Sequence, residues 1–403
     1  MAKELFTEYF YQNPYSREME STIELCFEYE AGLYAVVAED SCFYPEGGGQ
    51  PGDRGEIIVA GKSYPVLDTI RRQGAILHLI PEPLAKTPVK AIFRIDWQRR
   101  FDFMQQHSGE HLISGICHSL KGYDNVGFHI NEETMVIDFN GELSPSELAE
   151  IELRANQAVW ENVEIEILFP SVAEAKALDY RSKKEVGERL RLVKVGNYDL
   201  CACCGTQLRK TGEIGPIRLR RMQKHRGGVR INAYCGRRAL LLDREQSEII
   251  DNLVQLFSEP QENLLVAAED RLEKLKNLDS ELALLRRSGV LEKAKAEAGA
   301  AYGIFIVEAF PAQELKDLAK ELSGDFRDFA LLLQVSEAEG KEQKCNFVAA
   351  RSPESESTYD LRELLQQLKE KFTVRAGGQA AFVQGQVEAE AKALAAYIKE
   401  LLA

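Results

Sequence analysis

The stretch QQHSGEH at residues 105–111 decides how the middle of this chain folds, together with CACCGT at residues 201–206. On a helix, His107 and His111 are four positions apart and project from one face, where both rings can reach one ion. Thiolates from a loop can complete such a site. We therefore expect a helix over residues 105–120 that contributes half of a metal site, the other half coming from a distant segment.

Two other interpretations of these motifs stay open. A pair of histidines at this spacing is often exposed, and three cysteines within four residues can be small buried side chains. The chain has 6 His and 8 Cys in 403 residues, and five of these fourteen fall in the two motifs, which favours a metal, with zinc as the default ion. The motif is not the HExxH of metallopeptidases, because Ser108 follows the first His, so a peptidase is disfavoured.

The composition, 45% hydrophobic and 28% charged, is typical of a soluble globular protein, and 403 residues allow two to four domains. No apolar run approaches the roughly 20 residues that span a membrane, and MAKELFTEYF lacks the apolar core of a signal peptide. We therefore expect a cytoplasmic protein without a membrane partner. The cysteines have no disulfide-framework spacing, so we expect reduced thiols and metal ligands.

The net charge of −14 argues against a nucleic-acid partner, but its distribution along the chain is uneven. Residues 214–242 contain no acidic residue, and the segment alternates like two strands around a Gly227-Gly228 turn. Such a ribbon suits phosphates, and the alternative is an ordinary solvated face. Its cations are Arg218, Arg220, Arg221, Lys224, Arg226, Arg230, Arg237 and Arg238.

We expect an α+β fold in four parts. Residues 1–95 contain short β-prone runs such as GLYAVVAED and GEIIVAG, as in a small β-barrel. Residues 96–242 mix helices and strands, with a second helix over 144–160, a hairpin in FHINEETMVIDFNG and the cysteines in a loop after YDL. Residues 243–295 form a helical coiled arm, and residues 296–403 return to an α/β pattern.

Three features of these parts have open interpretations. The run CFYPEGGGQPGDRG contains Gly47, Gly48, Gly49 and Gln50, which suit either close approach to a ligand or a plain hairpin connection. In VRAGGQAAFVQGQ, Gly377 and Gly378 form a glycine loop that enters a helical tail over residues 387–403, either to bind phosphate or to turn. The arm has an apolar stripe that needs a partner, either a second chain or the helix around residues 249–257. The stripe consists of Leu272, Leu275, Leu278, Leu282 and Leu285.

Together, HSGEHL, the CCGT loop and RINAYCGRRAL resemble the editing domain of alanyl-tRNA synthetase and its free-standing relatives, the AlaX alanyl-tRNA editing proteins. FYPEGGGQPGDRG is similar to the glycine motif of the barrel that precedes that domain. The arm and AGGQAAFVQG resemble the C-terminal DHH-associated domain, so the likeness follows the order of the long AlaX form. The length leaves no room for a synthetase catalytic domain, so aminoacylation is not expected.

The resemblance implies hydrolysis of the ester between a wrong amino acid, serine or glycine, and tRNA for alanine. An alanine pocket rejects these two amino acids poorly, so a second hydrolytic site is needed. The resemblance implies zinc as cofactor, mischarged tRNA as partner and a possible homodimer through the arm or the C-terminal domain. The alternative function is a non-catalytic RNA-binding protein with a structural zinc.

The zinc ligands that the resemblance implies are His107, His111 and Cys203, and the family's fourth ligand, a histidine, falls on Gln207. A neutral amide is a weak zinc ligand. Either Cys201 or Cys204 replaces the histidine, or three protein ligands leave an open position, or the site has lost its metal. Polar candidates for substrate contacts and catalysis are Gln106, Ser108 and His129, each of which can also be an ordinary helix-surface or hairpin residue.

Overall fold

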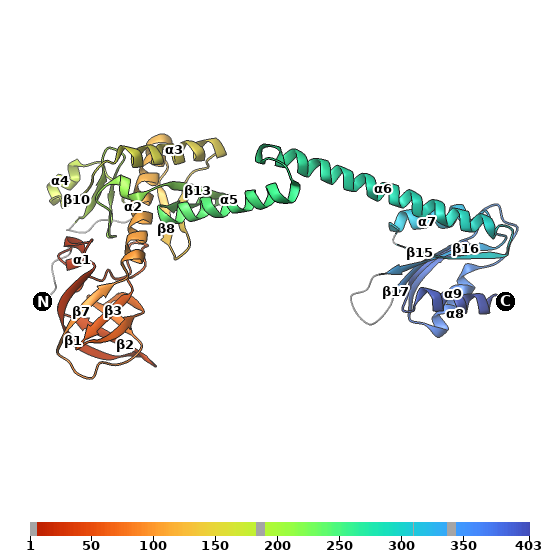
Figure 1. Ribbon diagram of the computed structural model, residues 1–403, viewed down its shortest axis with the longest axis horizontal. Coiled ribbons are helices and arrows are strands. Elements are labelled where there is room, and N and C mark those ends of the chain that lie inside the picture. Colours follow the sequence, from red (N-terminus) through yellow and green to blue (C-terminus); the bar gives the residue numbers. More distant parts are fainter. Residues whose placement is uncertain (1–5, 183–189, 309, 337–343) are drawn as a thin grey trace. The chain divides into compact units, whose positions relative to one another are not determined.

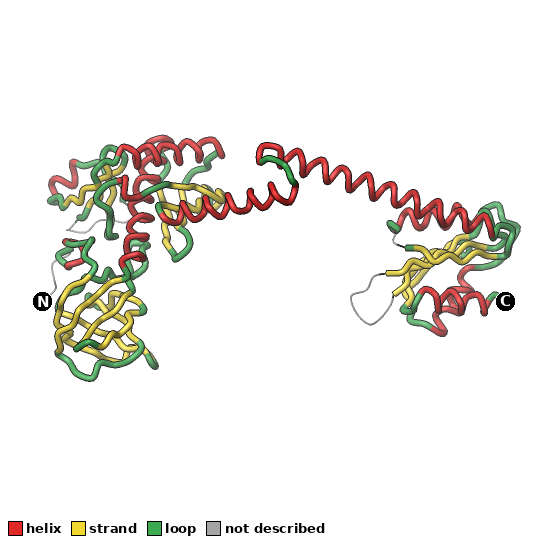
Figure 2. Tube along the Cα trace, viewed as in Figure 1, coloured by secondary structure: helices red, strands yellow, loops and turns green. Residues whose placement is uncertain are grey.

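The computed structural model describes residues 6–182, 190–308, 310–336 and 344–403 (Figure 1). The chain divides into two compact units, Met1–Asn252 and Leu253–Ala403. Both units combine helices with β-sheets, so the predicted mixed α and β class is confirmed (Figure 2). Within the described residues, no helix has the length and apolar character needed to cross a membrane.

The first unit begins with a short helix, α1 (Tyr9–Gln12), and a seven-stranded antiparallel sheet in the order β4-β3-β7-β1-β2-β6-β5. Inward-facing residues alternate along the strands, as Ala91, Phe93 and Ile95 do on β7, which buries one face. The β-rich prediction for residues 1–95 is confirmed, and closure of this sheet into a barrel remains a prediction. The strands are β1 (Glu18–Glu30), β2 (Leu33–Ala38), β3 (Gly55–Val59), β4 (Lys62–Val66), β5 (Asp68–Arg72), β6 (Ala75–Ile80) and β7 (Val89–Ile95).

The helix α2 (Trp97–Lys121) is the centre of the first unit and has most of its residues buried. Asp96 caps it by accepting a hydrogen bond from the Arg99 amide, and Gly122 ends it in the left-handed conformation. The sequence-based start at residue 105 is wrong by eight residues. The first turns of this helix are polar, so their sequence lacks the apolar pattern that indicates a buried helix. Arg100 in these turns is nevertheless fully buried, because it forms an ion pair with Asp53.

A four-stranded sheet in the order β13-β14-β9-β8 packs against α2 and α3. The second predicted helix is α3 (Pro145–Glu161), which begins where Ser144 and Glu147 form the capping box that the sequence indicates. The predicted hairpin is β8 (Asn125–Ile130) with β9 (Met135–Phe139). A smaller three-stranded sheet follows it. Its strands are β10 (Ile165–Leu168), β11 (Leu192–Val195) and β12 (Asp199–Ala202), and the short helices nearby are α4 (Val172–Ala177) and η1 (Thr211–Ile214).

The basic segment forms the predicted hairpin of β13 (Ile217–His225) and β14 (Gly228–Cys235). The turn lies at Arg226-Gly227, one residue before the Gly227-Gly228 turn expected from the sequence. Arg226 and Gly227 both have positive φ, +47° and +82°, as in a two-residue type I′ turn, while Gly228 already pairs with His225.

The arm consists of α5 (Arg237–Phe257), a single turn η2 (Gln261–Asn263) and α6 (Leu264–Ala296). The predicted helical segment is therefore confirmed, with an interruption after Phe257. Along α6, Leu272, Leu275 and Leu285 are each more than half exposed. Pairing of this stripe with a partner helix or a second chain stays a prediction.

The second unit has a five-stranded sheet in the order β15-β16-β17-β19-β18, parallel only between β15 and β16. The helix α7 contacts β16 and β17, whereas α8 contacts β18 and β19. The strands are β15 (Tyr302–Val307), β16 (Phe329–Ser336), β17 (Lys344–Ala350), β18 (Val374–Gln379) and β19 (Phe382–Val387), and the helices are α7 (Ala312–Ser323), α8 (Leu361–Lys371) and α9 (Ala391–Leu401).

The expected glycine loop in this unit is wrong. Gly377 and Gly378 lie within β18 and pair with Gln384 and Val383 of β19, so they form part of a hairpin rather than a loop that enters a helix. The tail helix begins only at Ala391. The backbone amides of Gly377 and Gly378 are therefore not at a helix N-terminus, which was the basis of the phosphate-binding interpretation.

Candidate metal centre

Three side chains far apart in the sequence meet where α2 faces the loop after β12. The ligand atoms of His107, His111 and Cys203 all lie within 4.8 Å of one another. The Cys203 Sγ is 3.2 Å from His107 Nε2, and the two imidazoles stack with ring centroids 5.6 Å apart. The helical spacing thus places both histidines on one face of α2, beside the thiol.

The glycine motif fixes the orientation of the first histidine. His107 Nδ1 lies 2.9 Å from Gln50 Oε1, and because an amide oxygen can only accept, the proton is on Nδ1. Gln50 is fully buried and donates through Nε2 to Thr206 Oγ1 at 2.9 Å. The lone pair of His107 Nε2 therefore faces Cys203.

The second histidine is oriented by a carboxylate. His111 Nδ1 donates to Asp199 Oδ2 at 2.9 Å, and Arg181 holds the same carboxylate with Nε and Nη2 at 2.8 and 2.9 Å. His111 Nε2 is then a buried atom without a hydrogen-bond partner among the described residues. A carboxylate behind the ring and an unpaired nitrogen in front of it are what a metal-binding histidine requires, so the donor set fits zinc.

The charges of the cluster favour an ion pair between a Cys203 thiolate and a protonated His111. Burial alone raises the pKa of Cys203, but the neighbouring His107 and His111 outweigh it and hold that pKa well below its usual value. Burial likewise lowers the pKa of His111, yet the negative charge of Cys203 and the bond to Asp199 raise it well above its usual value. A thiolate is the form of cysteine that ligates metals.

None of the three predicted candidates stands as a fourth ligand. The buried Gln207 turns its oxygen to Ser108, which corrects the expectation that this residue ligates. Cys204 is exposed, and its carbonyl accepts hydrogen bonds from the hydroxyls of Tyr11 and Tyr44. Cys201 groups with His111 and Asp199 but not with the other two ligands. Among the described residues, the donors that group around one point are therefore those of His107, His111 and Cys203.

The polar candidates for substrate contacts do not converge on this cluster. Both polar atoms of Gln106 bind the backbone of Cys235 on β14. The Ser108 hydroxyl is shared between Gln207 and the Leu208 amide, and His129 is an exposed residue of β8. Gln106 and Ser108 are thus held by other parts of the protein, and their contacts with substrate stay a prediction.

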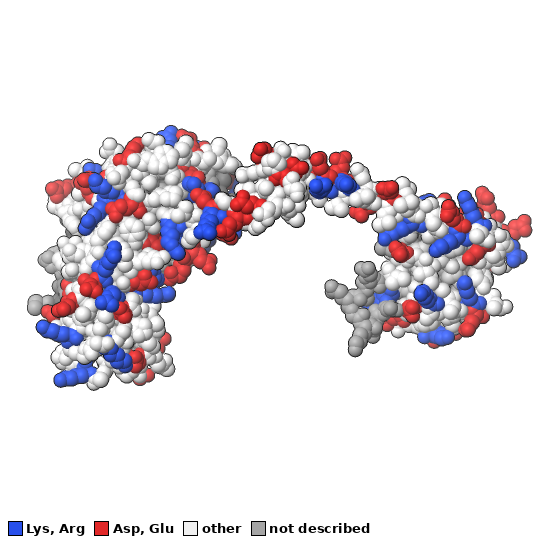
Figure 3. Space-filling model, in the orientation of Figure 1, with Lys and Arg blue, Asp and Glu red and all other residues white. Residues whose placement is uncertain are grey.

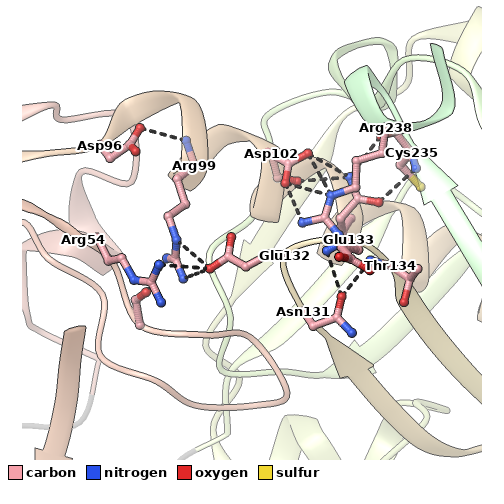
Figure 4. Close-up of polar contacts among 12 residues, drawn as sticks. Arg54, Asp96, Arg99, Asp102, Asn131, Glu132, Glu133, Thr134, Cys235 and Arg238 are labelled. Atoms are coloured by element: carbon pink, nitrogen blue, oxygen red, sulfur yellow. Dashed lines mark hydrogen bonds and ion pairs between the residues drawn. The ribbon is translucent and has the colours of Figure 1, made fainter. Parts of the chain in front are cut away.

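Ion pairs around the first turns of α2 hold the helix in place (Figure 4). Asp102 pairs with Arg238 at the start of α5, beside the Cys235 that Gln106 binds. Arg99 pairs with Glu132 in the β8–β9 turn. These contacts hold α2 at one end of the four-stranded sheet, where β14 ends and β8 turns into β9.

The glycine motif packs directly on the metal-binding segment. A Cβ on Gly49 would lie 2.6 Å from the ring of Phe128, which in turn contacts His107. A Cβ on Gly205 would lie 2.1 Å from Cε1 of the His107 ring. Glycine at these positions lets the backbone close around the His107 ring, so the plain hairpin interpretation of this motif is incomplete.

The sequence-based analysis missed the residues that orient the ligands. Asp199 and Arg181 had no motif to mark them, although Asp199 stands two positions before the cysteine run. Tyr11 and Tyr44 contact the same loop from the first 50 residues. Only their meeting in space shows that they belong to the site.

Most cations of the basic hairpin pair with acidic residues. The pairs are Arg218–Asp243, Arg220–Glu152, Lys224–Glu142 and Arg230–Asp138, and Arg238 binds Asp102. Figure 3 shows basic and acidic side chains interspersed on the visible face. Arg221 and Arg226 of the hairpin, and Arg237 at the start of α5, are exposed and have no ion pair within the described parts of the chain, so they are the cations that remain available to a partner.

Comparison with known proteins identifies a family to which this chain is similar. Residues 190–232, which contain the cysteine loop, match the family described as threonyl and alanyl tRNA synthetase second additional domain. The alanyl-tRNA editing protein AlaX-L of Pyrococcus horikoshii is 29% identical over 397 residues, which is 94% of each chain. The chain is a relative of the AlaX alanyl-tRNA editing proteins.

Other relatives match a smaller share of this chain or are much longer than it. Alanyl-tRNA editing protein Aarsd1-B of Xenopus laevis is 31% identical over 278 residues, 66% of each chain. The alanine–tRNA ligase of Pyrobaculum arsenaticum is 29% identical over 96% of this chain, which spans only 43% of that ligase. A crystal structure of the C-Ala domain of Aquifex aeolicus alanyl-tRNA synthetase covers 24% of this chain with 23% identity and a TM-score of 0.20.

Proposed function

We propose that this protein is a zinc-dependent deacylase that hydrolyses serine or glycine from mischarged tRNA for alanine. The observation that supports it most is the set of three oriented ligands, to which the described residues add no fourth, in a chain related to alanyl-tRNA editing proteins. Three protein ligands and one free position are typical of catalytic zinc, whereas structural zinc sites are closed by four protein ligands.

The protein's own residues prepare the site in this proposal. His107, His111 and Cys203 would hold the ion, with the two rings kept in one tautomer by Gln50 and Asp199. Bound zinc would supply Lewis-acid chemistry, lowering the pKa of a water or polarising the ester carbonyl. A site that hydrogen-bonds the serine hydroxyl would discriminate against alanine, which leaves that partner unpaired.

The tRNA body would bind outside this site. We expect Arg221 and Arg226 of the hairpin to contact phosphates, and the second unit to contribute further contacts in the cytoplasm, where tRNA is charged. Arg218, Arg220, Lys224 and Arg230 remain candidate contacts, although each must first leave its acidic partner. Surface ion pairs of this kind contribute little energy, so phosphates can replace them.

Purified protein incubated with Ser-tRNA, Gly-tRNA and Ala-tRNA for alanine tests the proposal. Serine or glycine should be released far faster than alanine, and Cys203→Ala should remove the difference by removing a ligand. Zinc analysis of the same Cys203→Ala preparation is the control. Background release of all three amino acids from zinc-loaded protein would favour the non-catalytic RNA-binding alternative.

A further inference from the structure

Gln207 lies beside the predicted ligand Cys203, and its amide has a defined orientation. The Leu208 amide donates to Ser108 Oγ at 3.0 Å, so the hydroxyl proton of Ser108 is free to be donated. It is donated to Gln207 Oε1 at 2.7 Å, because only the oxygen of an amide accepts. The amide nitrogen Nε2 is thereby turned toward Cys203 Sγ, 3.6 Å away.

The reversed amide is disfavoured by the same contacts. It would place Gln207 Oε1 beside the Cys203 sulfur and would turn the N–H of Gln207 toward the Ser108 hydroxyl, whose oxygen already accepts from the Leu208 amide. Ser108 and Gln207 are both buried, so no solvent compensates for such a contact. The orientation therefore follows from one serine on α2 and one backbone amide.

We infer that Gln207 is a positioning residue that donates an N–H to the metal-binding thiolate of Cys203 and leaves the fourth position without a protein ligand. A hydrogen bond to a ligating sulfur withdraws electron density from it and so tunes the metal. Ser108 is a positioning residue as well, because it acts through Gln207. It accepts from the Leu208 amide and donates its hydroxyl proton to Gln207. The inference rests on the zinc site of the proposed function and adds the reason for a glutamine at this position.

Cobalt(II) substituted for zinc provides a readout that needs neither RNA nor turnover. In the wild-type protein, the thiolate-to-cobalt charge-transfer band should shift when azide is added, because azide can enter an open position. In Gln207→His, the introduced imidazole should occupy that position, tighten metal binding and remove the response to azide. A wild-type spectrum that ignores azide would overturn the open position.

Two further variants test the hydrogen bond itself. Gln207→Leu removes the N–H donor at similar volume, so the charge-transfer band should move to longer wavelength and metal affinity should fall roughly 10-fold. Ser108→Ala keeps Gln207 but frees its amide to rotate, and it should shift the band in the same direction. Circular dichroism of each metal-loaded variant checks that the fold is kept.

The outcomes separate this inference from the proposed function. Unchanged spectra and affinity in folded Gln207→Leu would overturn the role of Gln207, even if the protein deacylates tRNA. Shifted spectra in a protein without deacylase activity would support the role of Gln207 and reject the proposed reaction.

Discussion

At the scale of single residues, the partners of the ligands matter as much as the ligands. Gln50 is 57 positions from His107 and lies in the loop between β2 and β3, yet it alone receives the proton of His107 Nδ1 among the described residues. Without this acceptor the ring can adopt the other tautomer, which turns an N–H toward the ion.

We therefore expect Gln50→Ala to weaken zinc binding about 10- to 100-fold, measured by competition with a chromophoric chelator. Gln105→Ala is a matched control, because that side chain binds the Glu213 carbonyl and no ligand. Equal affinities of wild type and Gln50→Ala would contradict the assigned role.

His78 provides a pH-dependent prediction that is independent of the metal. Burial lowers the pKa of His78 to about 4, although the Val36 carbonyl opposes this shift. The unfolded chain keeps a pKa near 6.5, so as pH falls below that value the unfolded state binds a proton that the folded state refuses. Burial of the neutral His78 therefore contributes fully to the stability of the folded state above pH 6.5. The free energy of unfolding falls by about 3 kcal/mol as the pH falls from 6.5 to about 4.

Urea unfolding of wild type and His78→Gln between pH 7 and 4 measures this loss. Intrinsic fluorescence reports on the first unit alone, because Trp97 and Trp160 are the two tryptophans of the chain. The glutamine keeps a polar side chain beside Ser41 and Val36 but does not titrate. An acid destabilisation of the same size in both proteins would show that other groups cause it.

At the scale of elements, the β13–β14 hairpin is less uniformly basic than its sequence indicates. Arg221 lies at an irregularity between Arg220 and Gln223 with φ of +51°, and Arg226 lies in the turn with φ of +47°. Arg221 therefore lies on the edge strand of the sheet and Arg226 at the tip of the hairpin, and neither forms an ion pair within the described residues.

The double variant Arg221→Ala/Arg226→Ala should weaken tRNA binding and reduce the salt slope of log K by about one unit for each lost phosphate contact. Filter binding at several salt concentrations measures both effects. Arg244→Ala is the control, because Arg244 is exposed on α5 and pairs with Glu248 outside the hairpin. An unaltered slope would assign the hairpin to ordinary solvated surface.

At the scale of the whole molecule, the chain consists of two units whose boundary lies within α5. The sequence-based boundary at residue 242 would remove Asp243, the partner of Arg218. The complete donor set, with Gln50, Asp199 and Arg181, belongs to the first unit.

A fragment of residues 1–252 should therefore fold and bind zinc as tightly as the full chain, while its affinity for tRNA should be lower. Metal analysis and filter binding of both proteins check the two parts. An insoluble fragment would show that residues beyond 252 are needed for folding, and undiminished tRNA affinity would exclude a role of the second unit.

The sequence by itself determined the local features. Each of these features depends on residues within a few positions of one another. They are the i,i+4 histidines, the capping box of α3, the turn of the basic hairpin and the helical arm. Hydrophobic periodicity and capping therefore report them without knowledge of the fold, and the cysteine loop was recognisable from its residue types alone.

Only the tertiary structure decided which residues orient the ligands and which cations are free. The bond between Gln50 and His107, and that between Asp199 and His111, join residues 57 and 88 positions apart. The direction of the Gln207 amide depends on Ser108, 99 positions away. Hydrogen bonds and ion pairs act over a few ångströms in space and have no period along the chain, so their partners are settled when α2, the glycine motif and the cysteine loop pack together.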